Sequence, residues 1–254
     1  MLAVFAFEPA AAADPTASGS GPTPYPAAGN VAAWPGKGPI KSLGYMAGER
    51  AAFWKRREID QGKVVFVGDS IVGGWKLQKD FPDKPVANRG IGGDVSRGVL
   101  FRFQEDVLDL HPKAVVIVIG GNDTSADGRL EDYLSNINAI LDLAQSANPD
   151  MPVILCAITP KGIPTSGPKA ASPGLATYLQ RVYATIPSRN AELAKIPSTR
   201  KNVTYVDFYT PLLLPDGSGI DVSLFNADQV HPTDAGHTKL AEILNKTLTD
   251  LKVF

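Results

Sequence analysis

The chain has 254 residues, 44% of them hydrophobic, and a formal net charge of −1 at neutral pH. It can bury a full core as one α/β domain, and its charge gives no indication of a nucleic-acid or acidic-membrane partner. No run of about 18 apolar residues is present to span a membrane, the single cysteine excludes an intrachain disulfide, and the scattered histidines (His111, His231, His237) do not form a standard zinc site.

The first 44 residues differ in composition from the rest of the chain. Residues 1–15 (MLAVFAFEPAAAADP) contain an apolar stretch and an alanine-rich segment that resemble the end of a secretory signal, although a basic start is missing. Residues 14–38 carry five prolines and five glycines, which is typical of an extended linker. We therefore predict a signal-like remnant and tail at 1–44 and a folded domain at 45–254. The protein is expected to be secreted or periplasmic, or cytoplasmic if residues 1–15 are a plain disordered tail.

From about residue 45 the chain alternates between helix and strand patterns. A helix of mixed charge comes first, over AGERAAFWKRREIDQG. Short apolar runs then predict five strands, at 64–67, 85–88, 114–119, 153–158 and 203–208. Helical patterns lie near 96–108, 129–145, 174–195 and 233–250. Pro187 is expected to break or kink the third of these, and Thr233 is the candidate N-cap of the last.

This alternation predicts the fold class. Strand–helix–strand units form right-handed crossovers and a parallel sheet. We expect an α/β fold, namely a three-layer α/β/α sandwich around a flavodoxin-like parallel sheet of about five strands. The loop at 160–174 is rich in proline, glycine and serine and is long for such a fold, which favours a functional role.

Four polar clusters lie after the predicted strands or before the last helix. They are Gly68-Asp69-Ser70, Asn88-Arg89-Gly90-Ile91-Gly92-Gly93-Asp94, Gly120-Gly121-Asn122-Asp123 and Asp228-Gln229-Val230-His231-Pro232. Parallel strands end at one edge of the sheet, and in flavodoxin-like order the first strand lies between the second and third. We therefore expect Ser70, Gly93 and Asn122 to converge.

The converging residue types suit nucleophilic catalysis by serine. A serine nucleophile needs a base, a group that orients the base, and donors for the developing oxyanion. His231 can be the base, and Asp228, three residues earlier, can hold one imidazole nitrogen protonated. The backbone N–H groups of Ser70 and Gly93 and the amide of Asn122 can form the oxyanion hole. Asp234 is also three residues from His231, but we assign it to the first turn of the last helix.

The clusters resemble the conserved blocks of the SGNH (GDSL) hydrolase superfamily. GDS is similar to block I, NRGIGGD to block II, GGND to block III and DQVHP to block V, in the family's order and over roughly residues 63–250. The stretch GIGGDVSRG is most similar to the branch with platelet-activating-factor acetylhydrolase-like and carbohydrate-esterase-like members. The resemblance implies a three-layer fold, Ser70 as nucleophile, Gly93 and Asn122 in the oxyanion hole, and an Asp228/His231 pair. Many members have leucine or threonine where this chain has Ile71, a difference that affects the pocket only.

Each cluster alone also has a structural explanation. Gly-Asp-Ser and Gly-Gly-Asn-Asp are common turn sequences, and Asp-x-x-His is frequent in helix caps. The ordered combination favours a serine hydrolase. The nucleophile elbow of α/β-hydrolases, the P-loop and the HExxH motif are absent, and the glycines at 90, 92 and 93 do not complete a dinucleotide fingerprint.

Other conspicuous residues are expected to have structural roles. Cys156 is predicted to be a buried core residue, and His237 a surface or packing residue. Trp75 is expected either to line the acyl pocket or to pack in the core. For Arg89 and Arg97 we predict structural ion pairs rather than substrate binding.

The predicted enzyme is a serine esterase that acts through an acyl-enzyme on short-chain esters, mainly acetyl esters, without a metal or cofactor. O-acetyl groups on carbohydrates are the favoured substrates, because the segments beside the catalytic blocks are small or polar. Alternatives are a short-chain lipid esterase or lysophospholipase, a thioesterase, an acyltransferase, or a carbohydrate-binding scaffold with a degenerate site. The expected partner is a small-molecule or oligosaccharide ester, with no nucleic acid and no membrane span; the oligomeric state is not predicted.

Overall fold

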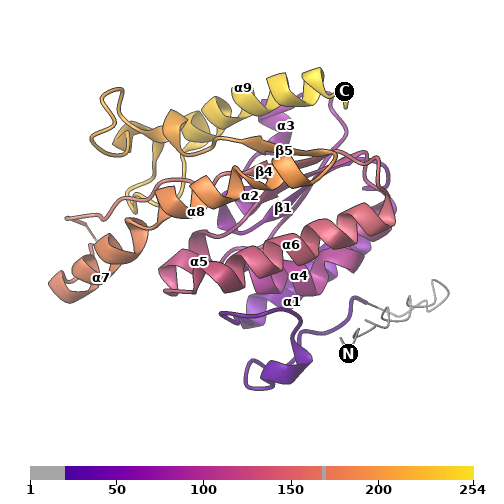
Figure 1. Cartoon of the computed structure of the whole chain (residues 1–254), viewed down its shortest axis with the longest axis horizontal. Coiled ribbons are helices and arrows are strands. Elements are labelled where there is room, and N and C mark those ends of the chain that lie inside the picture. Colours follow the sequence, from indigo (N-terminus) through magenta and orange to yellow (C-terminus); the bar gives the residue numbers. More distant parts are fainter. Residues whose placement is uncertain (1–20, 168–169) are drawn as a thin grey trace, which may run out of the picture.

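The computed structural model describes residues 21–167 and 170–254. The predicted signal-like residues 1–15 lie outside this part of the chain. In the described residues, a five-stranded sheet lies between two layers of helices (Figure 1). No helix of the described residues is long and apolar enough to cross a membrane.

All strand pairs in the sheet are parallel, and the strand order is β2-β1-β3-β4-β5. The strands are β1 (Val64–Gly68), β2 (Val86–Gly90), β3 (Ala114–Val118), β4 (Val153–Cys156) and β5 (Val203–Val206). The three-layer fold and the flavodoxin-like order predicted from the sequence are confirmed. Gly68 pairs with Gly90 on one side and with Val118 on the other, so three neighbouring strands end level with one another.

Alternate residues of the strands face opposite helical layers, as the two-residue period of a strand requires. Val65, Val67 and Ile117 pack with α4 (Ser96–Asp106), α6 (Leu130–Ala147) and α8 (Ile186–Leu193). Val64, Phe66 and Val116 pack with α3 (Leu77–Asp80) and α9 (Asp234–Asp250). The remaining helices are α1 (Gly44–Lys55), α2 (Ser70–Gly73), α5 (Gly121–Ser125) and α7 (Pro173–Tyr183). In Figure 1, α9 lies above the sheet and α4 and α6 lie below it.

The helix predicted at 174–195 is divided into α7 and α8. The division falls at Ala184 and Thr185, and Pro187 stands in the first turn of α8. A proline is tolerated there because the first N–H groups of a helix have no acceptor within it. The predicted interruption is confirmed.

The proline- and glycine-rich segment before α1 is packed against the domain from residue 22 onward. The Arg97 guanidinium donates hydrogen bonds to backbone carbonyls of this segment, those of Val31, Trp34, Pro35 and Gly38. The prediction of an ion pair for Arg97 is therefore wrong, although its role is structural. Composition predicted only a linker, because the contacts depend on individual residues that composition does not distinguish.

Aromatic rings and a polar side chain add to this attachment. The rings of Tyr25 and Trp34 stack with centroids 5.6 Å apart, and Phe101 of α4 packs on both. Asn136 of α6 exchanges hydrogen bonds with the backbone of Lys37, at 3.0 and 2.8 Å. Residues 22–43, which we call the N-terminal arm, thus lie along α4 and α6.

The other residues given structural roles from the sequence are buried. Arg89 forms a buried ion pair with Asp60 at 2.8 Å, as predicted. Trp75 lies in the core and stacks on the His237 ring, with centroids 5.0 Å apart, so His237 is a packing residue and Trp75 is not exposed to an acyl pocket. Cys156 is buried in β4.

Candidate active site

Ser70 lies at the carboxyl edge of the sheet because β1 ends at a tightly packed glycine. A Cβ atom at Gly68 would lie 2.0 Å from the carbonyl oxygen of Val118, so a larger residue would force the two strands apart. Asp69 then accepts a hydrogen bond from the Ile71 N–H at 3.0 Å and caps α2, whose first residue is Ser70. The serine is held on a fixed turn beside the ends of β2 and β3.

Ser70, His231 and Asp228 form a continuous chain of polar contacts. Ser70 Oγ lies 2.8 Å from His231 Nε2, and His231 Nδ1 lies 2.8 Å from Asp228 Oδ2. The backbone N–H groups of Val230 and His231 also donate to Asp228 Oδ1, each at 3.1 Å. Partial burial alone would raise the pKa of Asp228, but the hydrogen bonds from the His231 ring and from these N–H groups outweigh it and hold the pKa well below its usual range. Asp228 is therefore ionised at neutral pH.

Asp234 does not take part in this chain. Its carboxylate pairs with Lys76 at 2.9 Å and with Lys79 at 3.3 Å, on the outer side of α9. Thr233 caps α9 by accepting a hydrogen bond from the Gly236 N–H at 3.3 Å, as the sequence predicted. Of the two aspartates three residues from His231, the structure places Asp228 against the imidazole.

The loop after β2 brings backbone N–H groups to Ser70. A Cβ atom at Gly92 would lie 3.8 Å from Ser70 Cβ, and Gly93 adopts a φ of +76°, which favours glycine. Among the described residues, no acceptor is found for the N–H of Ser70 or of Gly93. Both donors lie at the edge of the sheet where the sequence predicted them.

The side chain of Asn122 is held in the same region by three contacts. Its Nδ2 donates to the Asp94 carbonyl at 2.9 Å and to Asp69 Oδ2 at 3.3 Å. Its Oδ1 accepts from Lys41 Nζ at 3.4 Å. The contacts on both ends of the amide fix its orientation: the N–H groups point to Asp94 and Asp69, the residue before Ser70, and the oxygen faces Lys41 of the N-terminal arm.

Buried charges fix the loop that carries Gly93. Asp94 pairs with Arg102 at 2.8 Å, and Arg102 also donates to the carbonyl of Gly68 at 3.0 Å. Burial raises the pKa of the Asp94 carboxyl, and the Arg102 charge limits the rise. Asp123 accepts hydrogen bonds from the N–H and hydroxyl of Ser96, at 2.9 and 2.6 Å, and so joins α5 to the start of α4. These pairs connect the ends of β1, β2 and β3.

Three residues near the site were not assigned a role from the sequence. Asp69 was quoted only as part of Gly-Asp-Ser, although an aspartate before a helix is a recognisable N-cap. Lys161 follows β4 and donates to the Gly121 carbonyl at 2.7 Å and to Ser125 Oγ at 3.1 Å. Burial lowers the pKa of Lys161 to about 8, against the opposing charge of Asp69. The only sequence feature that pointed to Lys161 was the length of the 160–174 loop. The third residue, Tyr45, lines the hollow described next, and no sequence feature pointed to it.

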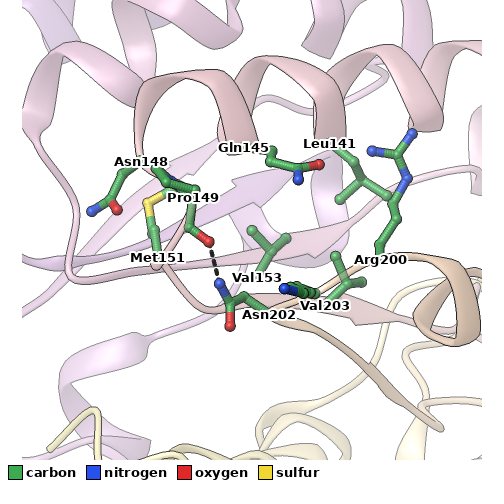
Figure 2. A pocket seen from close by; sticks show the side chains of 10 residues that line it. Leu141, Gln145, Asn148, Pro149, Met151, Val153, Arg200, Asn202 and Val203 are labelled. Carbon is green, nitrogen blue, oxygen red and sulfur yellow. Dashed lines mark hydrogen bonds between the residues drawn. The ribbon is translucent and has the colours of Figure 1, made fainter.

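A hollow of about 460 Å³ opens beside Ser70, and this volume is within the usual range for a ligand site. Its lining combines polar and aromatic side chains with glycines and one proline: Tyr45, Glu49, Ser70, Gly73, Gly74, Gly90, Gly92, Asn226, His231, Pro232 and His237. A second cavity lies at the opposite edge of the sheet, between the end of α6 and the starts of β4 and β5 (Figure 2). Its volume of about 10 Å³ is at most that of one water molecule, so it is not a substrate site. The described residues contain no cluster of three or more side chains suited to a metal ion.

Comparisons with known proteins agree with the motifs in the sequence. A family model described as the GDSL-like lipase/acylhydrolase family matches residues 66–239. Platelet-activating factor acetylhydrolase IB subunit alpha2 of Rattus norvegicus is 27% identical over 193 residues, which cover 74% of this chain and 76% of that protein. The corresponding alpha1 subunit of the same species is 32% identical over 105 residues, or 39% of this chain and 44% of that protein.

Solved structures share the fold. A GDSL-like lipase from Bacteroides thetaiotaomicron has a TM-score of 0.60 at 25% identity and covers 76% of this chain and 90% of its own. An acetylxylan esterase from Geobacillus stearothermophilus has a TM-score of 0.51 at 21% identity, with 75% and 94% covered. The resemblance drawn from the four sequence blocks is confirmed. The chain belongs to the GDSL-like lipase/acylhydrolase family, and it is a carboxylic ester hydrolase.

Proposed function

We propose that the enzyme is a serine acetylesterase that removes O-acetyl groups from carbohydrates through an acyl-enzyme. The observation that carries the catalytic part is the chain of two 2.8 Å contacts from Ser70 through His231 to Asp228. Ser70 Oγ attacks the ester carbonyl while His231 takes its proton. The ionised Asp228 keeps Nδ1 of the imidazole protonated and stabilises the imidazolium that forms.

The same imidazolium then gives its proton to the leaving alcohol as the ester C–O bond breaks. In the second half of the reaction His231 takes a proton from water, which attacks the acetyl-enzyme. The bond from the acetyl carbon to Ser70 Oγ then breaks, Oγ regains the proton from His231, and acetate leaves. The oxyanion is bound by the N–H groups of Ser70 and Gly93 and by Asn122 Nδ2. In the resting enzyme one amide hydrogen of Asn122 contacts Asp69 at 3.3 Å, the longer of its two donor contacts. We assign this hydrogen to the oxyanion, because a developing negative charge is a stronger acceptor than a distant carboxylate oxygen.

The acyl preference is supported by the lining of the site. Each methylene of a longer acyl chain would need buried apolar surface to gain its roughly 0.8 kcal/mol. The segments beside the proposed catalytic residues are small or polar (Gly73-Gly74, Asp123-Thr124-Ser125 and Asn226-Ala227), so they offer little apolar surface to a longer acyl chain. The rat relative is named for an acetylhydrolase activity, which agrees with a small acyl group.

A short-chain lipid ester is the second candidate, because platelet-activating factor in the name of that relative is a lipid. The test is a series of p-nitrophenyl esters from acetyl to palmitoyl, run beside acetylated xylo-oligosaccharides with acetate release measured. We expect the highest kcat/KM at acetyl, a steep fall beyond butyryl, and acetate release from the oligosaccharides. A maximum at octanoyl or longer would support the lipid esterase instead. Activity on acetyl esters with no acetate from the oligosaccharides would remove the carbohydrate assignment and leave the enzyme class intact.

A further inference from the structure

One part of the lining of the hollow comes from a single helix, α1. Tyr45 and Glu49 lie one turn apart on α1, so both side chains are on the same face of the helix. Both line the hollow together with the catalytic Ser70 and His231. Two side chains outside the proposed catalytic machinery thus reach the site from an element that the motifs do not include.

Tyr45 is exposed but fixed. The residue is 52% exposed, whereas its hydroxyl donates a 2.7 Å hydrogen bond to the Gly92 carbonyl. The hydroxyl also lies 3.1 Å from the position that a Cβ atom at Gly93 would take. An aromatic ring held by its polar end presents its apolar face to a ligand without losing rotamer freedom on binding.

Glu49 differs from most charged groups near the site. Asp69, Asp94, Asp123 and Asp228 all accept hydrogen bonds from protein donors. Within the described residues, the Glu49 carboxylate has no hydrogen-bond donor or cationic partner. A carboxylate in this state can accept hydrogen bonds from ligand hydroxyls, and it disfavours a phosphate in the same place.

The proton transfers of the proposed reaction indicate which part of the ester occupies the hollow. His231 must protonate the leaving oxygen, so the alcohol has to lie on the side of Ser70 where His231 is accessible. An acetyl group needs only a few tens of Å³, far less than the roughly 460 Å³ of the hollow. The larger alcohol is therefore the part that fills it.

We infer that Tyr45 and Glu49 form a subsite for the leaving alcohol, with the chemistry of a neutral sugar ring. The ring stacks on Tyr45, and its hydroxyls donate to Glu49. At Gly92, which lines the hollow between these groups, a Cβ atom would lie 3.7 Å from the Tyr45 hydroxyl and 3.8 Å from Ser70 Cβ, so the glycine keeps a side chain out of the space beside both. This inference rests on the proposed carbohydrate esterase function and adds the residues that select the alcohol.

The test compares two acetyl esters that differ in the alcohol: acetylated xylo-oligosaccharides and p-nitrophenyl acetate. We expect Glu49→Gln and Tyr45→Ala each to lower kcat/KM on the oligosaccharide about five- to tenfold more than on p-nitrophenyl acetate. Tyr45→Phe keeps the ring but loses the hydrogen bond to Gly92, so it should lower the ratio of the two activities less than Tyr45→Ala does. Glu242→Gln removes the same charge from an exposed position of α9 outside the hollow, so it is the matched control and should change neither activity. Thermal unfolding verifies that each variant is folded.

Equal losses on both substrates in Tyr45→Ala and Glu49→Gln would overturn the subsite while leaving the proposed function in place. The same conclusion follows if Glu49→Gln loses activity on acetylcholine but not on the oligosaccharide, because the carboxylate would then select a cation. If the unmodified enzyme hydrolyses p-nitrophenyl acetate and releases no acetate from the oligosaccharide, the carbohydrate function itself fails, and the subsite fails with it.

Discussion

At the scale of single residues, the site has two kinds of group with different sensitivities to substitution. Ser70, His231 and Asn122 are the groups proposed to act on the substrate, whereas Asp69, Asp94 and Lys161 hold the backbone around them. Substitutions of the first kind should change kcat with little effect on stability. Those of the second kind should change the pH dependence or the stability as well.

Ser70→Ala should abolish ester hydrolysis and leave the fold intact. Within residues 21–167 and 170–254, the hydrogen bond of the Ser70 hydroxyl is to His231 alone, so its loss breaks no other hydrogen bond of this part of the chain. Loss of the nucleophile from a serine hydrolase costs roughly 10⁴–10⁶ in kcat. The measurement is the p-nitrophenyl acetate rate with a thermal unfolding control, and a fluorophosphonate label should map to the peptide with Ser70 in the unmodified enzyme. Substantial turnover by the folded variant would rule out Ser70 as nucleophile.

Asp228→Asn and Asp234→Asn should differ strongly, although both residues are three positions from His231. The amide at 228 would favour the wrong imidazole tautomer and should lower kcat by about 10⁴ at neutral pH. Asp234 contacts two exposed lysines, so its substitution should change kcat by less than about threefold. Equal mild effects of the two substitutions would show that serine and histidine act as a dyad.

Asn122→Ala should lower kcat far more than it raises KM. An oxyanion donor interacts mainly with charge that develops in the transition state, and losing one costs about 10²–10³ in rate. Steady-state kinetics on p-nitrophenyl acetate separate the two parameters. A change in KM alone would make Asn122 a ground-state binding residue.

Lys161 should make kcat fall at alkaline pH, which gives the plot of kcat against pH an alkaline limb. Its ammonium faces Asp69, Asp123, Lys41 and the Tyr183 ring, and burial lowers its pKa to about 8. The charged form is therefore present below about pH 8 and is lost as the pH rises, which removes the positive charge that stabilises the buried Asp69 carboxylate beside Asn122. We expect kcat to fall above this pH. Lys161→Arg should shift the limb upward, and Lys161→Met should lower kcat at pH 7 and remove the limb. An unchanged pH profile in Lys161→Met would contradict this role.

At the scale of elements, the N-terminal arm is the part that sequence patterns described least well. Strands and helices can be predicted from the periodicity of their apolar residues. The predicted strands at 64–67 and 114–119 agree with β1 and β3 to within one residue at each end. The arm has no periodicity, and its attachment depends on Arg97, which reaches it from α4. Single side chains that bridge distant segments leave no local pattern to detect.

Arg97→Met should therefore destabilise the protein by roughly 2–4 kcal/mol, because four backbone carbonyls of the arm lose a donor in a buried or partly buried place. Urea unfolding measures the change, and limited proteolysis should cut residues 22–43 faster in the variant. Arg181→Met removes an exposed pair with Asp127 and is the control, with an expected change below about 1 kcal/mol. Equal unfolding free energies for the two variants would contradict a holding role for Arg97.

At the scale of the whole molecule, the parallel sheet explains which residues of the site could be predicted from the sequence and which could not. Strand order places the ends of β1, β2 and β3 side by side, so the motifs that follow them were expected to converge, and the structure places Ser70, Gly93 and Asn122 at that edge. Tyr45 and Lys161 come from segments whose path is not determined by the sheet. Their positions depend on how α1 and the loop after β4 fold back, which local patterns do not encode.

The separation between the sheet edge and α1 has a consequence for how this enzyme could diversify. Two of the proposed oxyanion donors are backbone N–H groups on turns held by buried ion pairs and by tightly packed glycines. One wall of the hollow consists of surface side chains on a single helix that precedes the sheet in the chain. Evolution, or a designer, can exchange the exposed face of α1 and leave the reaction centre untouched, so new alcohols become accessible without rebuilding the chemistry.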